Sequence, residues 1–262
     1  AAVAAQAMIA ARLSEIASLR NGGWPTTAPS LPQRFLRHAD EQTVVGMHAL
    51  LAAIASIPEP RQPLDCDGVV AASCQAGRLA GAHTLVQARR GGGVTVSTQI
   101  VPQCSLHSPA GAVSVGLGMH GPNIGVSGGP EALSEGLLAA FSWLHGQGAH
   151  ACERVWLIVT GWDDEPALDT DATPCTDPIC RAVAVGLTRA SAAGDGLLLR
   201  MAATNNDSAD RQPAPVNPLL AFGEALAARR RAAEVVRWSH RCPWGMAVRL
   251  ETAAAHAGRE AA

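Results

Sequence analysis

A short β-prone run that passes through a glycine turn directly into an apolar helix constrains this fold more than any other feature. The run Asn123–Ser127 follows a Gly121-Pro122 turn, and Gly128-Gly129 separates it from a helix that begins with Pro130. Proline suits the first helical position, because the amide that it lacks would have no partner there. A strand, a tight turn and a helix place the turn residues at a strand end, facing a helix N-terminus. Many α/β proteins carry their chemistry in this geometry.

The composition excludes several classes of protein. The chain has 262 residues, of which 48% are hydrophobic and 16% charged, and its formal net charge is −2. This length can build one large domain or two small ones, and the nearly neutral charge argues against nucleic-acid binding. The seven cysteines are scattered without a CxxC pair, which is typical of reduced thiols in a cytoplasmic protein. No charge-free apolar run reaches the length of roughly 18 residues that a membrane helix needs.

Alternating apolar segments predict an α/β fold, in which a mostly parallel sheet is covered by helices. Val155–Gly161 is a continuous apolar run, typical of a strand that is buried on both faces. We expect further strands at Gly68–Ser73, Val94–Ile100, Ala182–Leu187, Leu197–Met201 and within Trp238–Leu250. We expect helices at Ala4–Leu19, Gln33–Ser56, Leu79–Arg90, Leu106–Leu117, Pro130–Leu144 and Pro218–Arg231.

The order of elements around the central turn resembles that of a β-ketoacyl synthase of the thiolase-like superfamily. The matching features are a Gly/Ala-rich helix at Ala110–Gly118, the Gly121-Pro122 turn, the strand, the long helix and a second strand that ends near the acidic Glu165. The resemblance covers about Leu31 to Met201. It implies a thiolase-like α/β fold with a truncated second half. Residues 1–166 would be the N-terminal half, and residues 167–262 a shortened C-terminal part packed on the same domain.

The chain departs from this family at its catalytic residues. The family's nucleophilic cysteine is the ninth residue after the glycine of the turn, which here is Pro130, or Gly129 or Glu131 with one gap. The family also uses two histidines in glycine-rich loops, whereas only His240 and His256 follow Glu165 here. Covalent acyl transfer needs an activated nucleophile and donors for the oxyanion. We therefore expect no catalytic residue in this chain.

A ketosynthase-like chain without its nucleophile resembles the chain-length-factor subunits of type II polyketide and aryl-polyene systems. This resemblance implies that the chain pairs with an active ketosynthase, or with itself, and shapes the tunnel for the growing chain while an acyl carrier protein delivers substrate. Polyketide, polyene and fatty-acid-like synthesis all stay open. The implied tunnel residues are Gln103, Leu106, His107 and Met119. The implied dimer interface is the strand after the turn, comprising Asn123, Ile124, Gly125, Val126 and Ser127.

Two other functions remain open from the sequence. Residues 125–129 match G-x-S-x-G, the nucleophile elbow of α/β-hydrolases, so Ser127 could act as a nucleophile with Asp163 or Asp164 and with His240. That alternative would make the protein a serine hydrolase or thioesterase. The other alternative is a homodimeric scaffold without a ligand.

Two smaller motifs favour structural roles. Cys104 and His107 could form a nucleophile–base pair, but they lie where the family's tunnel helix begins. Asp163-Asp164-Glu165 offers oxygen ligands that would suit Mg²⁺ or Ca²⁺, although a solvated loop at a strand end explains it better. We expect neither a metal nor a cofactor.

Overall fold

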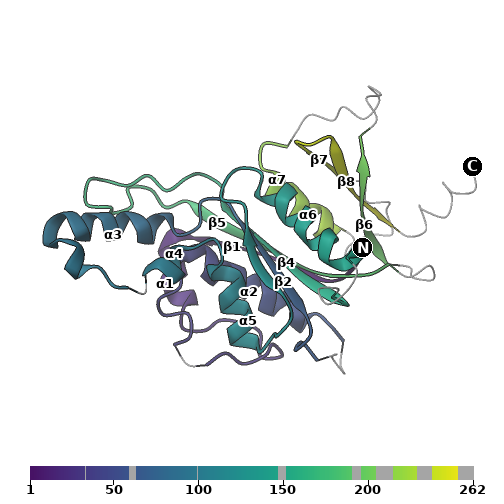
Figure 1. Ribbon diagram of the computed structural model, residues 1–262, viewed down its shortest axis with the longest axis horizontal. Coiled ribbons are helices and arrows are strands. Elements are labelled where there is room, and N and C mark those ends of the chain that lie inside the picture. Colours follow the sequence, from purple (N-terminus) through teal and green to yellow (C-terminus); the bar gives the residue numbers. More distant parts are fainter. Residues whose placement is uncertain are drawn as a thin grey trace, which may run out of the picture.

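One mixed sheet with helices on both faces forms the framework of the protein (Figure 1). The computed structural model describes the chain except for residues 33, 59–62, 99, 147–151, 191–195, 205–214, 229–237 and 253–262. Within the described residues the strands are β1 (Ala2–Arg12), β2 (Gly68–Ser73), β3 (Asn123–Val126), β4 (Arg154–Trp162), β5 (Ile179–Thr188), β6 (Leu197–Ala203), β7 (Trp238–Cys242) and β8 (Met246–Thr252). The helices are α1 (Leu13–Leu19), α2 (Glu41–Ala55), α3 (Arg78–Gly91), η1 (Gly93–Thr95), α4 (Ile100–Cys104), α5 (Ser108–Leu117), α6 (Ala132–His145) and α7 (Pro218–Ala228).

The strands lie in the order β3-β2-β4-β5-β1-β6-β8-β7. Only the β3–β2 and β2–β4 neighbours are parallel, and the other described neighbours are antiparallel. The predicted α/β class is therefore confirmed, but the prediction of a mostly parallel sheet is wrong. The reason is β5. Strands β1 to β4 all run in one direction, but β5 runs in the opposite direction between β4 and β1, so both of its pairings are antiparallel.

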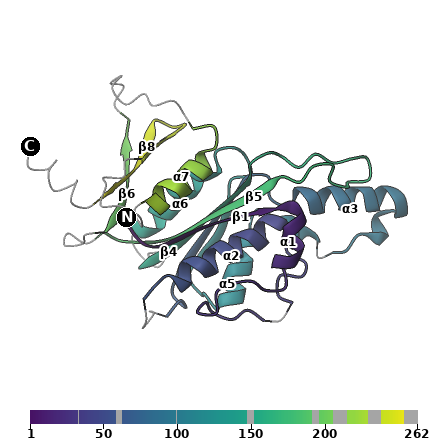
Figure 2. The ribbon, with the colours of Figure 1, turned by 180° about the vertical axis from the view of Figure 1, so that it is seen from behind.

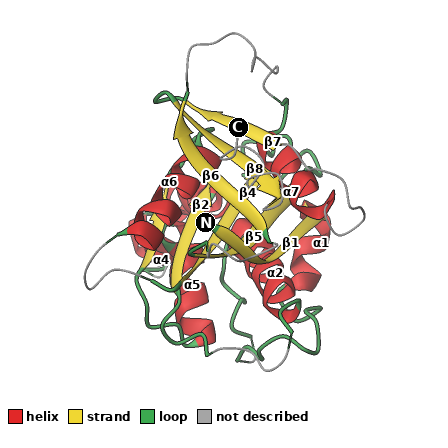
Figure 3. Ribbon diagram, turned by 90° about the vertical axis from the view of Figure 1, so that its right-hand side faces the viewer, coloured by secondary structure: helices red, strands yellow, loops and turns green. Residues whose placement is uncertain are grey.

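Alternate residues of the central strands enter two separate cores, as a strand period of two requires. Val69 of β2 and Ile158 of β4 point into the core beneath α1, α2 and α5. Val70 and Leu157, one position away, point into the core beneath α6 and α7. Figure 3 shows these two helical layers on opposite sides of the sheet. Burial of both faces explains the continuous apolar sequences of β2 and β4.

The strands β6, β8 and β7 extend the sheet beyond β1 and curve over α6 and α7, so that these helices lie between two parts of one sheet (Figures 1 and 3). Both helices contact β7. The rings of Phe222 on α7 and Trp238 on β7 lie 4.9 Å apart between centroids. This C-terminal part closes the second core.

Helix α3 projects from the body of the protein (Figures 1 and 2). Leu79 is its only buried residue, and two ion pairs connect it to the loop after β4. They are Arg78–Glu165 and Arg90–Asp171. No described helix is long and apolar enough to cross a membrane.

Several predicted elements differ from the structure. The helix predicted at Ala4–Leu19 is instead strand β1 followed by the short helix α1. Of the strand predicted at Val94–Ile100, the first two residues lie in η1 and Ile100 begins α4. The second predicted helix begins only at Glu41, because the Asp40 carboxylate accepts a hydrogen bond from the Thr43 amide and caps the helix there. The end of the helix predicted at Pro218–Arg231 lies outside the described residues, as does His256.

Candidate functional site

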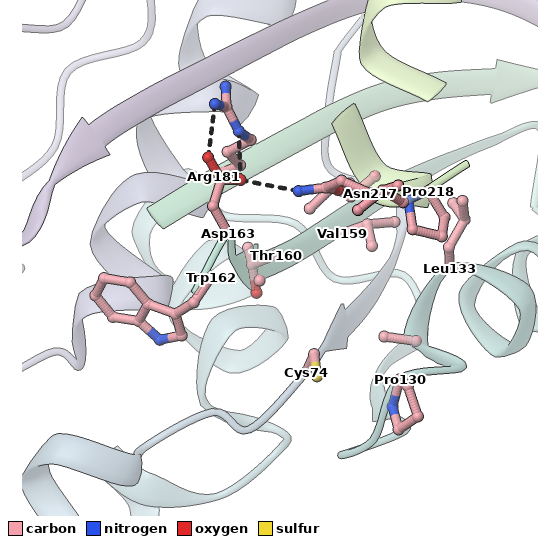
Figure 4. Close-up of a pocket in the computed structure, with 14 residues that line it drawn as sticks. Cys74, Pro130, Leu133, Val159, Thr160, Trp162, Asp163, Arg181, Asn217 and Pro218 are labelled. Carbon is pink, nitrogen blue, oxygen red and sulfur yellow. Dashed lines mark hydrogen bonds and ion pairs between the residues drawn. The ribbon is translucent and has the colours of Figure 1, made fainter. Parts of the chain in front are cut away.

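A pocket of about 200 Å³ lies where β2 and β4 end and where α6 and α7 begin (Figure 4). The carboxyl ends of parallel strands meet at one edge of a sheet, which is where open α/β sheets form their ligand sites. The residues that line it are Cys74, Pro130, Ala132, Leu133, Val159, Thr160, Gly161, Trp162, Asp163, Arg181, Val216, Asn217, Pro218 and Leu219. Pro130, expected from the sequence at the place of the nucleophile, is thus part of the pocket wall.

The end of β2 is held beside β4 by hydrogen bonds. The Cys74 amide donates to the Thr160 carbonyl at 3.1 Å, and Gln42 on α2 donates to the Cys74 carbonyl at 2.7 Å. These bonds fix the Cys74 thiol at the pocket, where it is partly exposed. Burial raises the pKa of the Cys74 thiol, so the thiol is protonated at neutral pH.

A charged network forms one wall of the pocket. Arg181 on β5 donates two hydrogen bonds to Asp163, at 2.6 and 2.7 Å. Asn217 donates its side-chain amide to the same carboxylate at 2.9 Å, and its side-chain oxygen accepts from the Leu220 amide at 2.9 Å. One asparagine therefore caps α7 and also binds it to the residue that follows β4. Figure 4 shows the second of these bonds, from Asn217 to Asp163.

The start of α6 is bound to β7 by a second polar cluster. The Ser134 hydroxyl is fully buried and lies 2.8 Å from His240 Nε2 and 3.0 Å from a Glu131 oxygen. The His240 ring stacks on Trp238, with centroids 5.8 Å apart. Burial lowers the pKa of His240, while the Glu131 carboxylate opposes that shift. The cluster fixes the first turn of α6, and Ser134 within it is fully buried.

The structure does not assemble a triad around Ser127. Ser127 has a φ of 72°, a left-handed conformation that a nucleophile elbow would also adopt, but its hydroxyl bonds only to the backbone of Gly129, at 3.4 and 3.5 Å, among the described residues. His240 binds Ser134, and Asp163 binds Arg181 and Asn217. The geometry therefore does not favour the hydrolase alternative.

The predicted interface strand β3 is one of the two edge strands of the sheet, and among the described strands it pairs only with β2. Its backbone groups on the other side have no strand partner among the described residues, and Ile124 is 39% exposed. Gly125 of this strand lies very close to the segment that contains Leu106. A Cβ atom built on Gly125 would lie 1.9 Å from the Leu106 carbonyl oxygen. Leu106 thus lies directly against β3.

The predicted tunnel residues do not share one cavity. Gln103 and His107 line a second pocket of about 380 Å³ between the loop that precedes α2 and the segment from α4 to α5. Leu106 packs on β3, as described above, and Met119 is only 1% exposed in the core beneath α2 and α5. The Cys104–His107 pair is not supported as a nucleophile, because burial raises the pKa of the Cys104 thiol.

Two of the three acidic residues predicted as possible metal ligands are bound to arginines. Asp163 pairs with Arg181 and Glu165 with Arg78. No group of three potential metal ligands occurs in the described part of the chain.

Sequence reasoning did not select Cys74, Arg181 or Asn217. Cys74 follows strand β2 directly, and a polar residue just after a buried strand is a usable signal for a site at a sheet edge. Asn217 directly precedes the helix predicted at Pro218, where asparagine is a usual cap. Its second bond, to Asp163, joins residues that are 54 positions apart and has no sequence signature.

No protein-family model matches the chain, and no curated protein matches it. Among solved structures, a chain from "AntDE:AntF (apo): type II PKS acyl-carrier protein in complex with its ketosynthase bound to the hexaketide" matches with a TM-score of 0.56 and 12% identity, over 96% of this chain and 99% of that one. "The ishigamide ketosynthase/chain length factor" matches with a TM-score of 0.47 and 16% identity, over 87% and 71%. A β-ketoacyl synthase from Burkholderia phymatum matches with a TM-score of 0.46 and 13% identity, over 71% of this chain and 59% of that one.

The first of these matches runs over nearly the whole of both chains. The thiolase-like, ketosynthase-type fold that the central motif predicts is thereby confirmed. At this level of identity the likeness shows the fold and does not transfer a site or an activity.

Proposed function

We propose that this chain is a ketosynthase-like subunit without a nucleophile of its own, which pairs with an active β-ketoacyl synthase and shapes the tunnel for the growing acyl or polyketide chain. The observation that carries the proposal is Pro130. This residue lines a pocket at the expected place of the nucleophile, on a ketosynthase-type fold, and it has no group that could attack a thioester.

The other residues of this pocket support a role without bond-making. A thiol acts as a nucleophile only as the thiolate, usually next to a histidine or another cationic group. Cys74 lies in the pocket, but burial keeps its thiol protonated. No histidine is among the described residues that line the pocket, and its Arg181 is bound to Asp163.

Pairing through β3 is supported by its place at the sheet edge. An edge strand presents unpaired N–H and C=O groups, to which a strand of a second subunit can add. We propose that Asn123, Ile124, Gly125, Val126 and Ser127 form this contact, with an active ketosynthase as the partner. A second copy of this chain is the alternative partner.

The proposed tunnel residues follow from this pairing. Leu106 packs on β3, and the neighbouring Gln103 and His107 line the pocket beside α5. A partner bound at β3 would therefore lie close to that pocket. We propose that Gln103, Leu106 and His107 limit the space for the chain at the interface, that Met119 supports α5 from the core, and that an acyl carrier protein brings the substrate.

The test is to incubate the chain with malonyl- and acyl-loaded carrier protein, with and without a candidate ketosynthase, and to measure intact-protein mass and product. We expect no acyl adduct on this chain and product only when the ketosynthase is present. Ser127→Ala should leave product formation within about twofold of the unsubstituted chain, whereas a serine hydrolase loses nearly all turnover without its nucleophile. An adduct on Ser127, Cys104 or Cys74 would refute the proposal, and so would product formed by this chain alone.

A further inference from the structure

We infer that the outer face of the β6–β8–β7 part of the sheet binds the diphosphate group of a small molecule through three arginines. These strands lie at the end of the sheet opposite β3, and they curve over α6 and α7 (Figure 1). None of their residues lines the pocket beside Pro130. The inference therefore goes beyond the proposed tunnel function.

Alternation along the strands determines which side chains lie on the outer face. Leu199 of β6 and Val248 and Leu250 of β8 are fully buried in the core beneath α6 and α7. Successive side chains of a strand point to opposite faces, so Arg200 and Arg249, which lie next to these residues, point away from that core. Arg200 is exposed and Arg249 is partly exposed, as this placement requires.

The strand register brings two of the arginines together on this face. Arg200 pairs directly with Arg249, and Arg249 pairs in turn with Ser239 of β7. Directly opposite residues have Cβ atoms about 5 Å apart, so the two guanidinium groups can converge on one anion. Arg241 of β7 pairs with Ala247, two residues before Arg249, and is therefore a diagonal neighbour of Arg249 at about 7–8 Å.

The outer face carries an excess of positive charge. Glu251 lies on the same face as Arg200, because its partner Leu198 lies two residues before Arg200. Three arginines and one glutamate leave an excess of two positive charges. Like charges directly opposite each other on a sheet are destabilising. An anion with several negative charges, bound between the arginines, would relieve this repulsion.

The arrangement favours a phosphoryl group over a carboxylate. A carboxylate pairs with the fork of a single guanidinium, whereas a phosphoryl group has three acceptor oxygens that two arginines can share. Arg200 and Arg249 would hold one phosphoryl group and Arg241 the second, while the Ser239 hydroxyl donates to an oxygen between them. Because this face is a sheet surface, it selects for the diphosphate and not for the organic group attached to it.

The experiment is isothermal titration calorimetry of the whole chain in a buffer without divalent cations. The probes are sodium pyrophosphate, ADP, orthophosphate and a hexaglutamate peptide. Arg249→Gln and Arg241→Gln each remove one guanidinium from the face. Arg89→Gln is the matched control, because Arg89 is an exposed arginine on α3 and its replacement removes the same charge elsewhere. Circular dichroism establishes which variants are folded.

We expect pyrophosphate and ADP to bind, and orthophosphate to bind about tenfold more weakly because it can engage fewer of the arginines. Arg249→Gln should weaken pyrophosphate binding at least about tenfold, as for loss of a hydrogen bond between charged groups. Arg241→Gln should reduce the preference for pyrophosphate over orthophosphate. Arg89→Gln should leave the affinity within about twofold, since distant exposed charges are screened.

The relative affinities of the probes identify the source of the diphosphate. Tighter binding of ADP than of pyrophosphate would assign the site to nucleotides, and equal binding would assign it to the diphosphate alone. The inference fails if pyrophosphate does not bind, or if the folded Arg249→Gln and Arg241→Gln variants bind it as before. It also fails if the hexaglutamate peptide binds as tightly as pyrophosphate, which would indicate an acidic protein partner. None of these results depends on whether a ketosynthase partner is found.

Discussion

Gly125 shows how a single residue joins the proposed interface strand to the proposed tunnel segment. An added Cβ atom would lie 1.9 Å from the Leu106 carbonyl oxygen and 2.6 Å from the His107 nitrogen, so the loop has to move if any side chain is present. Overpacking of this kind typically costs 1–3 kcal/mol. We expect Gly125→Ala to lower the free energy of unfolding by about 3 kcal/mol, measured by urea denaturation, because both contacts are with backbone atoms that cannot rotate away.

Gly129 provides the matched control for that substitution. It lies in the turn after the same strand, no atom lies within 4 Å of its added Cβ, and its φ is not in the left-handed region. We expect Gly129→Ala to change the free energy of unfolding by less than about 1 kcal/mol. Equal losses of unfolding free energy in Gly125→Ala and Gly129→Ala would show that the contact between β3 and Leu106 does not contribute to stability.

For single residues, the sequence predicted that Pro130 lies near the site, but not which side chains line the pocket with it. Pro130 does lie beside the strand ends, but the helix that was expected to begin with it, α6, begins two residues later at Ala132. The sequence could not predict that Arg181 neutralises Asp163, because that contact depends on the antiparallel return of β5.

The sequence predicted the bounds of a helix or strand best where a single turn or cap determines its ends. Strands β2 and β4 and helices α3 and α6 lie within a few residues of their predicted ranges. Strand β1 was predicted as a helix because its sequence is rich in alanine, but helix propensity is a weak preference that tertiary contacts override. Pairing with β5 along its whole length determines this strand. A glycine of α7 lets that helix approach β1 closely, because an added Cβ on Gly223 would lie 2.3 Å from Met8 Sδ.

A second element-scale prediction concerns the attachment of β7 to α6 through His240. Burial lowers the pKa of His240 in the folded protein, below the unfolded value of about 6.5. Protonation therefore favours the unfolded state, so this stabilisation is complete above about pH 6.5 and is lost as the pH falls below that value. We expect the midpoint of urea unfolding to be lower at pH 5.5 than at pH 7.5. The difference between these two midpoints should be smaller in His240→Gln.

The comparison with His240→Gln is needed because other buried groups titrate as well. Burial raises the pKa of the Asp40, Glu41 and Asp67 carboxyls, and a raised carboxyl pKa favours the folded state as the pH falls. These contributions are common to both proteins and cancel in the difference between them. An identical pH dependence in the two proteins would exclude His240 as a pH-sensitive contact.

For the whole molecule, the two edges of the sheet that the described residues form determine how the chain can associate. The edge strands are β3 and β7, and β3 lies beside the proposed tunnel segment. The elements of residues 167–262 do not form a second sheet in the described part of the chain; β5 lies inside the main sheet and β6, β7 and β8 extend it. The sequence predicted a shortened C-terminal part but not this arrangement, because strand order depends on long-range pairing that leaves no local pattern.

An exposed edge strand predicts an oligomer, and β3 is the edge at which we expect it. Lysine on an edge strand is a common way in which proteins prevent edge-to-edge pairing. Ile124→Lys should therefore convert the dimer to monomer at micromolar concentration, with a Kd at least about 30-fold weaker, as for loss of a central interface residue worth about 2 kcal/mol. Leu85→Lys replaces a residue that is 73% exposed on α3, the helix that projects from the body of the protein (Figure 1), and it should leave the dimer intact. Analytical ultracentrifugation of the chain, alone and with a ketosynthase, measures both variants. A stable monomer of the unsubstituted chain under both conditions, or a dimer that Ile124→Lys does not weaken, would exclude pairing through β3.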